Sequence, residues 1–216
     1  MTDPDRARMR ELQAEYERRG DAVGWFEALY REGVANPDLI PWARMAPRPE
    51  LEAWHQRTRR DLQGRACLVV GCGLGDDAEF LARAGGRVTA FDIAPTAVAW
   101  CRRRFPSSSV SYVVADLLSP PEGWRRHFDL VLECNTLQTM RTGARERAMA
   151  SVASFLAPGG RLLVICRGRD PEEPLGELPW PLTRADLAAF GAYGLVEESF
   201  DDVVSEDVRR FVVEFS

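Results

Sequence analysis

Residues 66–77 read Ala66-Cys-Leu-Val-Val70-Gly71-Cys-Gly73-Leu-Gly75-Asp-Asp77, a short apolar run that leads directly into three closely spaced glycines. Five consecutive apolar residues predict a strand that is buried on both faces, because a strand exposed on one face would alternate with polar residues. Glycines allow the chain to turn tightly and let a ligand approach the backbone N–H groups at the start of a helix. The stretch therefore predicts a strand, a ligand-binding turn and a helix.

Short apolar runs and helix-length segments continue to alternate from Gly64 onward. We expect strands at residues 66–70, 87–92, 110–115, 128–133 and 161–167, and helices at residues 76–84, 95–105 and 144–156. This alternation is typical of an α/β fold with a parallel sheet covered by helices on both faces. The runs at residues 196–204 and 208–215 flank a Ser-Glu-Asp turn, which predicts an antiparallel hairpin at the end of the sheet.

Residues 1–63 have a different pattern and predict a helical leader that precedes the domain at residues 64–216. Apolar residues recur there at helical spacing in two groups: Met9, Leu12 and Tyr16, then Val23, Phe26 and Tyr30. Asp21 is placed to cap the second helix. Four prolines between residues 36 and 49 must interrupt helical structure before a third helix at about residues 49–62.

Composition limits the function classes. The 216 residues, 45% of them hydrophobic, are enough for one domain with an extension. The N-terminus is charged and has no apolar signal core, and no run of about 18 apolar residues occurs, so we expect a cytoplasmic protein without a membrane partner. A net charge of −5 without long basic stretches argues against nucleic acid as a partner.

The reactive residue types narrow the chemistry further. All 28 basic residues are arginines, which excludes mechanisms that need a Schiff-base lysine or a phosphate-loop lysine. The five cysteines form no C-x-x-C pair, so neither a zinc site nor a disulfide framework is indicated. Because His55 and His127 are the only histidines, we expect no metal site.

Two acidic residues at later strand ends complete a candidate ligand site. Asp92 ends the second expected strand, where a carboxylate can accept hydrogen bonds from both ribose hydroxyls of a nucleoside. Asp116 follows the third strand, near the position that the amino group of an adenine would occupy, and Ile93 and Leu117 could enclose the adenine ring. The G-x-G-x-G spacing lacks the third glycine of the dinucleotide pattern and suits a ligand without a pyrophosphate. Two alternatives stay open: the carboxylates only cap helices or turns, or the chain is an NAD-dependent oxidoreductase.

At this point the chain resembles the class I S-adenosylmethionine (SAM)-dependent methyltransferases. The resemblance rests on VVGCGLGDD, VTAFDIA, VVADLL, FDLVLECNTLQTM and LAPGGRLLVICRG, and it extends from about residue 65 to the end. It implies a Rossmann-like sheet of seven strands in the order 3-2-1-4-5-7-6, with the last strand antiparallel. It also implies that Gly71, Gly73 and Gly75 lie against the methionine part of SAM, that Asp92 holds the ribose, and that Asp116 with Leu117 holds the adenine.

Two further segments resemble the branch that contains thiopurine, thiol and halide methyltransferases. One is Gly24-Trp25 with Pro41-Trp42, similar to a tryptophan-rich leader that folds over SAM, and the other is the proline-rich segment at residues 177–183. Trp25 and Trp42 could cover the cofactor, since an aromatic face attracts a sulfonium cation. Ordinary core packing is the alternative for both side chains.

The end of the fourth strand should face the methyl acceptor. Glu133 is a candidate cofactor neighbour or weak base, and Asn135 and Gln138 either orient a substrate or begin a helix. Beyond the fifth strand, Arg167 and Arg169 either clamp an anion or pair with acidic loop residues. No single catalytic residue can be named.

The resulting hypothesis is transfer of a methyl group from SAM to a small molecule, with a thiol as one candidate acceptor and S-adenosylhomocysteine as the second product. O- or N-methylation of a small metabolite and SAM binding without turnover are the alternatives. The acceptor and the oligomeric state stay open.

Overall fold

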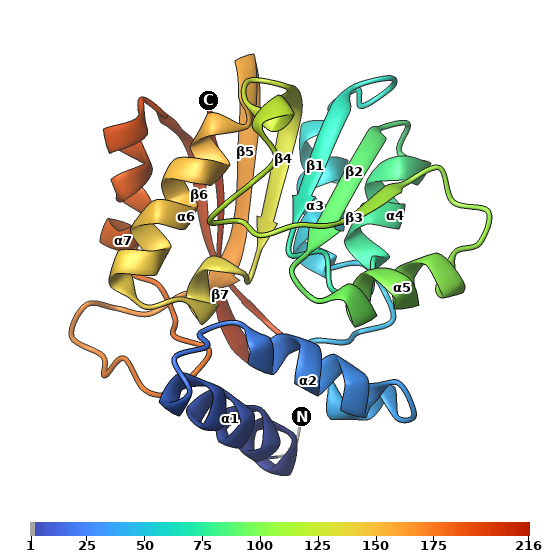
Figure 1. Cartoon of the computed structure of the whole chain (residues 1–216). Helices are drawn as coiled ribbons and strands as arrows, with labels where there is room; N and C mark the ends of the chain where they lie inside the picture. Colours follow the sequence, from blue (N-terminus) through green and yellow to red (C-terminus); the bar gives the residue numbers. More distant parts are fainter. Residues whose placement is uncertain (1–2) are drawn as a thin grey trace.

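The computed structural model describes residues 3–216, with side chains described from residue 7 onward, and it contains one seven-stranded sheet (Figure 1). The strands are β1 (Ala66–Val70), β2 (Arg87–Asp92), β3 (Ser111–Val114), β4 (Phe128–Cys134), β5 (Leu156–Arg167), β6 (Glu197–Ser205) and β7 (Val208–Phe215). Their order is β3-β2-β1-β4-β5-β7-β6, and only β7 runs antiparallel to its neighbours β5 and β6. The predicted fold class and strand order are confirmed.

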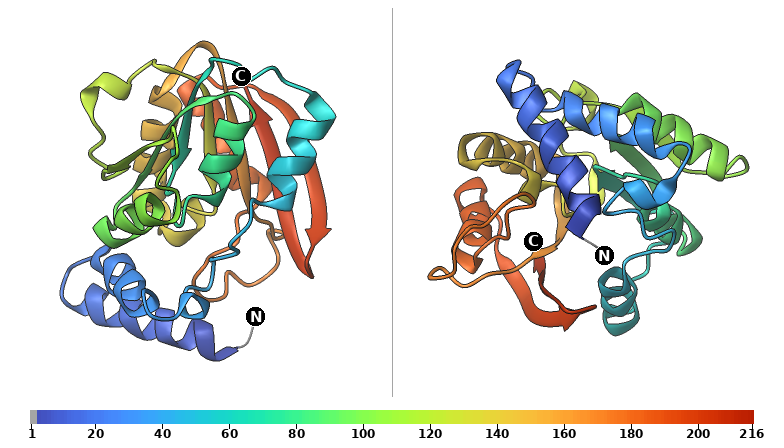
Figure 2. Two further views of the ribbon diagram at one scale, coloured as in Figure 1. Left: turned by 90° about the vertical axis from the view of Figure 1, so that its right-hand side faces the viewer. Right: turned by 90° about the horizontal axis from the view of Figure 1, so that it is seen from below.

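Helices cover both faces of the sheet (Figures 1 and 2). The helices are α1 (Asp3–Arg18), α2 (Gly24–Gly33), α3 (Pro49–Thr58), α4 (Asp76–Arg83), α5 (Pro95–Arg104), α6 (Thr142–Ser154) and α7 (Arg184–Ala188). Helices α3, α4 and α5 pack on one face, and α6 and α7 pack on the other. This arrangement follows from β1, where Cys67 and Val69 face the first group and Leu68 and Val70 face the second.

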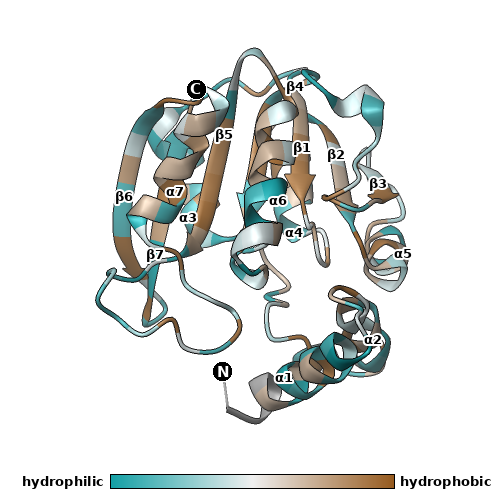
Figure 3. Ribbon diagram, turned by 60° about the vertical axis from the view of Figure 1, so that its left-hand side comes forward, coloured by the Kyte–Doolittle hydropathy of each residue, from teal (hydrophilic) through white to brown (hydrophobic). Residues whose placement is uncertain are grey.

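The hydropathy pattern explains why the sheet forms the centre of the molecule. The central strands are apolar along their length, whereas α1 and the outer helix surfaces are hydrophilic (Figure 3). All five residues of β1 are buried, as the uninterrupted apolar run predicts. Side chains on both faces of the sheet are thereby removed from water, which is the main stabilising contribution to this core.

Helices α1 and α2 lie across the carboxyl ends of the parallel strands (Figures 1 and 2). Asp21 Oδ1 accepts hydrogen bonds from the backbone N–H groups of Val23 and Gly24 at 3.1 and 2.8 Å, so it satisfies donors at the start of α2, although Val23 occupies the N-cap position. Glu27 on α2 accepts hydrogen bonds from the backbone N–H and the hydroxyl of Thr96 at the start of α5. The leader is therefore joined to the sheet domain by side chains that satisfy a helix terminus.

Two predicted boundaries are wrong. The third helix ends at Thr58 rather than near residue 62, because Arg59 takes a left-handed backbone conformation with φ of 47°. The sixth helix ends at Ser154, and β5 begins at Leu156 rather than at Arg161. Its first residues pair with β4 across a register shift, so the segment at residues 158–160 lies inside an irregular strand.

Glu214 on β7 anchors α3 to the sheet, and Glu214→Gln is expected to lower the free energy of unfolding by about 2 kcal/mol. The carboxylate is 3% exposed and accepts hydrogen bonds from Trp54 Nε1, at 3.0 Å, and from Arg60. The side-chain amide of glutamine would direct its N–H donor at Trp54 or Arg60, so one of the two hydrogen bonds would be lost. Urea unfolding measures the change, with the exposed Glu122→Gln as the control. Equal midpoints for Glu214→Gln and the unmutated chain would show that the pairing contributes nothing.

Candidate functional site

A cavity of about 1110 Å³ lies at the carboxyl edge of the sheet. Its walls come from the glycine turn after β1, the ends of β2, β3, β4 and β5, the leader, and the tip of the β6–β7 hairpin. Ligand pockets of drug-sized molecules measure about 300–1,000 Å³, so this cavity has room for a nucleoside-sized cofactor together with a small acceptor. Open α/β sheets bind ligands at this edge.

The glycine turn requires its glycines for two reasons. Gly71, Gly73 and Gly75 have φ values of 59°, 54° and 90°, in the left-handed region that other residues avoid. A Cβ atom on Gly71 would also lie 2.3 Å from Thr136 Oγ1, and one on Gly73 would lie 3.2 Å from the Tyr30 hydroxyl. The backbone of this turn therefore lies close to both the loop after β4 and the leader, and it forms part of the cavity wall.

Asp92 stands at the end of β2 with both oxygens oriented by the backbone. Oδ2 accepts a hydrogen bond from Gly73 N–H at 3.0 Å, and Oδ1 accepts one from Ala94 N–H at 2.9 Å. Burial raises the pKa of Asp92 to about 6, although these hydrogen bonds oppose the shift. Each oxygen keeps a further lone pair for a ligand hydroxyl.

The neighbouring strand end supplies the rest of the predicted nucleoside pocket. Asp116 Oδ1 accepts a hydrogen bond from Leu118 N–H at 2.8 Å, which fixes the carboxylate at the turn after β3. Asp116, Leu117 and Ile93 all line the cavity together with Asp92. The structure thus brings together four of the predicted contact residues from two adjacent strand ends.

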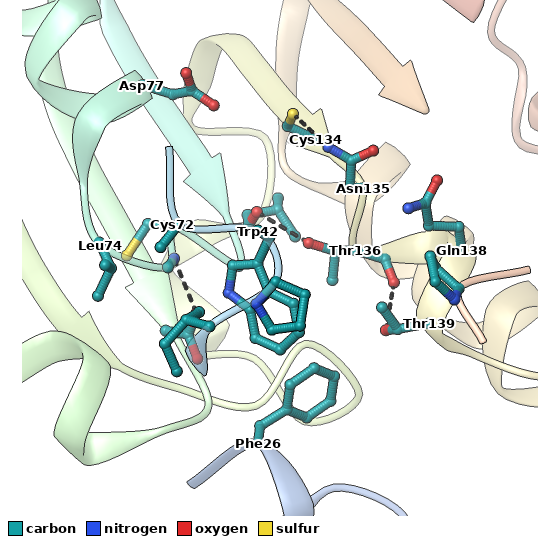
Figure 4. Close-up of a pocket in the computed structure, with 18 of the residues that line it drawn as sticks. Phe26, Trp42, Cys72, Leu74, Asp77, Cys134, Asn135, Thr136, Gln138 and Thr139 are labelled. Atoms are coloured by element: carbon teal, nitrogen blue, oxygen red, sulfur yellow. Dashed lines mark hydrogen bonds between the residues drawn. The ribbon is translucent and has the colours of Figure 1, made fainter. Parts of the chain in front are cut away.

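The aromatic wall differs from the prediction in one residue. Trp42 lines the cavity, and its Nε1 donates a hydrogen bond to the Tyr30 hydroxyl at 2.7 Å. Trp25 does not line it: the side chain is 1% exposed and packs in the cluster formed by α1, α2 and α5. Phe26 takes the place expected of Trp25, with its ring centroid 6.1 Å from that of Trp42 (Figure 4).

Asn135 follows β4 and presents an unsatisfied acceptor at the cavity wall. Its backbone is left-handed, with φ of 63°, and its Nδ2 donates a hydrogen bond to Cys134 Sγ at 3.2 Å (Figure 4). The Oδ1 atom is buried and has no hydrogen-bond partner. A buried polar atom without a partner is costly, so this one indicates a donor group on a ligand.

Glu133 was predicted as a contact residue, but the structure places it behind the wall. It is 0% exposed and outside the cavity lining, and its Oε1 accepts hydrogen bonds from the N–H groups of Thr136 and Leu137 at 2.6 and 2.9 Å. The carboxylate therefore holds the loop after β4 instead of touching a ligand. Sequence reasoning missed this role because the strand end alone does not show which way the side chain points.

Gln138 lines the cavity (Figure 4) and also holds neighbouring segments by hydrogen bonds, whereas the two predicted arginines separate. Gln138 Oε1 accepts a hydrogen bond from the backbone N–H of Arg167 at 2.8 Å, and the backbone carbonyl of Gln138 accepts one from the backbone N–H of Trp180 at 2.8 Å. Arg167 lines the cavity, but Arg169 does not. The guanidinium of Arg169 donates to the carbonyl groups of residues 170, 171, 173 and 181, so it orders the loop after β5.

The structure adds charged residues to the cavity that sequence reasoning did not find. Arg44 of the leader pairs with Glu206 at the tip of the β6–β7 hairpin. Asp77 Oδ1 accepts a hydrogen bond from Arg48 N–H at 2.7 Å, and burial raises the pKa of Asp77. Arg210 on β7 completes the set. Asp77 belongs to the VVGCGLGDD segment, but no sequence signal identifies Arg44, Glu206 and Arg210, which are far apart along the chain and belong to no local motif.

Residues 3–216 include no helix long and apolar enough to cross a membrane. The same part of the chain has no group of three or more histidine, cysteine, aspartate or glutamate side chains placed to hold a metal ion.

Glu133 gives a test of how the loop after β4 is held. Burial raises its pKa to about 7, from 4.5 in an exposed chain. Between these values the folded protein keeps a proton that the unfolded chain has released, so this group lowers the free energy of unfolding as pH rises from about 4.5 to 7. Glu133→Gln keeps the acceptor oxygen and removes the charge. Relative to the unmutated chain it should gain stability on the order of 3 kcal/mol between pH 4.5 and pH 8, measured by urea unfolding. A constant difference across this range would contradict the assignment.

Residues 67–160 match the family model described as a methyltransferase domain. The chain is 33% identical over 146 residues to Nodulation protein S of Sinorhizobium fredii (strain NBRC 101917 / NGR234), covering 65% of each chain. It is 34% identical over 119 residues to the Ubiquinone biosynthesis O-methyltransferase of Xanthomonas euvesicatoria pv. vesicatoria (strain 85-10), covering 53% of this chain and 48% of that protein. The chain thus spans less than two thirds of the length of either relative.

Among solved structures, the fold is similar to that of Burkholderia thailandensis 1,6-didemethyltoxoflavin-N1-methyltransferase, a structure with bound 1,6-didemethyltoxoflavin and S-adenosylhomocysteine. The TM-score is 0.70 at 19% identity, covering 88% of this chain and 86% of that one. Residues 67–160 are thus similar to methyltransferase domains, and the chain has the fold of the class I SAM-dependent methyltransferases.

Proposed function

We propose that the cavity binds SAM and that the chain transfers the methyl group of SAM to a small-molecule acceptor. The observation that carries the proposal is that the glycine turn, Asp92, Asp116 and Trp42 all line one cavity at the carboxyl edge of the sheet. The methyltransferase-domain match over residues 67–160 supports the same activity.

In this proposal each part of the wall holds one part of the cofactor. Asp92 accepts hydrogen bonds from the ribose hydroxyls, and Asp116 accepts one from the adenine amino group, with Ile93 and Leu117 against the ring. The turn containing Gly71, Gly73 and Gly75 lies against the methionine part. Asn135 Oδ1, which has no hydrogen-bond partner, accepts a hydrogen bond from an N–H group of the cofactor or of the methyl-accepting substrate.

The chain contributes alignment and exclusion of water. SAM supplies an electrophilic methyl group, and transfer requires the acceptor atom in line with the methyl carbon and the sulfur. Phe26 and Trp42 present aromatic faces where the sulfonium would lie, which favours a cation and keeps water away. We further propose that residues 1–63 act as a lid on the SAM-binding domain at residues 64–216.

A thiol is the first acceptor class to test. The tryptophan-rich leader and the segment at residues 177–183, of which Leu178 and Pro179 line the cavity, support a relation to the thiopurine and thiol methyltransferase branch. A thiolate needs no dedicated base, which fits a cavity lining without histidine among the described residues. O-methylation is the second candidate, favoured by the 34% identity to a ubiquinone biosynthesis O-methyltransferase.

The experiment combines calorimetry of SAM binding with measurement of S-adenosylhomocysteine release from panels of thiols, phenols and amines. Release with thiols supports the branch, and release with phenols or amines alone would keep methyl transfer and overturn the branch. SAM binding without release from any acceptor would favour a non-catalytic SAM-binding protein. Binding of NAD in preference to SAM would overturn the proposal.

A further inference from the structure

The cavity extends beyond the part that a nucleoside cofactor would fill. Neighbouring strands lie about 4.8 Å apart, so the distance from β3, beside Asp116, to β4 is roughly 15 Å, which is about the length of extended SAM. Strand β7 lies two positions beyond β4, a further distance of roughly 10 Å. Arg210 on β7 lines this outer end of the cavity.

Arg210 is a buried cation whose hydrogen bonds are incomplete. The residue is 5% exposed, and its Nε lies 3.0 Å from Glu50 Oε1 on α3. This contact is an ion pair without hydrogen-bond geometry, since Nε of Arg210 has no hydrogen-bond partner. The other oxygen of the Glu50 carboxylate, Oε2, has no hydrogen-bond partner either. A buried guanidinium is stable only when charge and hydrogen bonds compensate its desolvation, so a further acceptor is missing at this point.

The charged side chains that act on Arg210 are Arg48 of the leader, Glu50 of α3 and Glu206 at the hairpin tip. Burial, and after it the charge of Arg48 in the leader, holds the pKa of Arg210 below its usual value. Glu206 at the hairpin tip is held by Arg44, and Asp77 on α4 accepts the Arg48 N–H group. Both carboxylates thus accept hydrogen bonds from other groups, while Arg48 and Arg210 both line the cavity wall. An anion between them would relieve their repulsion.

We propose that Arg210, with Arg48 beside it, binds an oxyanion group of the methyl acceptor, so that the acceptor is an anionic small molecule such as a carboxylate. The planar fork of a guanidinium matches a carboxylate through two parallel hydrogen bonds. The inference rests on the proposed methyl transfer, because it assigns the outer end of the same cavity to the acceptor. The carboxylate of SAM itself offers the same chemistry, and the experiment separates the two sources.

The probes are matched acids and amides: 4-mercaptobenzoate, 4-hydroxybenzoate and 4-aminobenzoate, each compared with its neutral carboxamide. Binding to the protein saturated with S-adenosylhomocysteine is measured by calorimetry, and release of S-adenosylhomocysteine is measured with SAM. We expect at least one acid to bind roughly tenfold tighter than its amide. Equal binding of acid and amide in all three pairs, or binding of neither, would overturn the proposal.

The variants identify the residue responsible. Arg210→Gln alone leaves Glu50 as an unpaired buried charge, so it is paired with the double variant Glu50→Gln, Arg210→Gln, which removes both charges together. The exposed Arg103→Gln is the matched control. The double variant should lose the preference for the acid and keep its affinity for SAM, and the control should keep both.

Two results would count against the assignment. An acid preference that survives in the double variant would exclude Arg210 as its cause. A double variant that binds SAM weakly but binds decarboxylated SAM as the unmutated chain does would assign Arg210 to the cofactor carboxylate. Failure of the unmutated chain to bind SAM would instead contradict the proposed function itself, so the two failures are distinguishable.

Discussion

Asp92→Asn is expected to weaken SAM binding by roughly 100-fold or more, because it removes charge-assisted hydrogen bonds to the ribose and disturbs the turn that holds the carboxylate. Both oxygens of Asp92 already accept backbone N–H groups, from Gly73 and Ala94. An asparagine amide would present an N–H donor to one of these donors, so one contact becomes repulsive. Calorimetric titration with SAM measures the change.

The pH dependence of SAM binding provides an independent reading of the same group. Burial raises the pKa of Asp92 to about 6, so the free protein protonates this carboxylate as pH falls through that value. A protonated carboxyl is a weaker acceptor for the ribose hydroxyls, and SAM affinity should therefore decrease below about pH 6. Asp92→Asn should show a flatter profile over the same range. Equal affinity at pH 5 and pH 8 in the unmutated chain would contradict the role of Asp92.

Sequence reasoning was most successful where local pattern and tertiary environment agree. The uninterrupted apolar run at residues 66–70 could form only a strand buried on both faces, and the predicted bounds of β1 and β2 match the structure. The boundary between α6 and β5 was missed because pairing with β4 draws residues 156–160 into the sheet. Such pairing depends on a partner strand more than twenty residues away, which no local signal records.

In the candidate site, too, the residues placed by local sequence pattern were predicted, and the residues placed by tertiary packing were not. Backbone conformation and strand ends place the glycine turn, Asp92 and Asp116, and these residues share a cavity. Trp25 and Phe26 are adjacent aromatic residues whose rings stack with centroids 3.7 Å apart, so only the packed structure decides which of them lines the cavity. Ion pairs such as Arg44 with Glu206, or Glu50 with Arg210, join segments separated by about 160 residues and have no signature in the sequence.

Gly75→Ala is expected to lower the free energy of unfolding by about 3 kcal/mol and to weaken SAM binding with it. Gly75 precedes α4 with φ of 90°, and a Cβ atom there would lie 2.6 Å from the Tyr112 hydroxyl and 3.1 Å from Cys101 Sγ. Tyr112 cannot easily move away, because its hydroxyl donates a hydrogen bond to the buried Glu79 at 2.7 Å. The destabilisation from backbone strain and the destabilisation from the close contact with Tyr112 therefore add.

The matched control is Gly143→Ala in the first turn of α6, where a Cβ atom meets nothing within 4 Å and the backbone is not left-handed. That substitution should change stability by less than about 0.5 kcal/mol or increase it slightly, since alanine favours a helix. Thermal unfolding separates the two variants, with a decrease of roughly 10 °C expected only for Gly75→Ala. If Gly75→Ala unfolds like Gly143→Ala, the turn after β1 has enough freedom to accept a side chain. In that case the backbone of the turn is not held in place by Tyr112 and Cys101, and its fixed position would have to come from Thr136 and the leader.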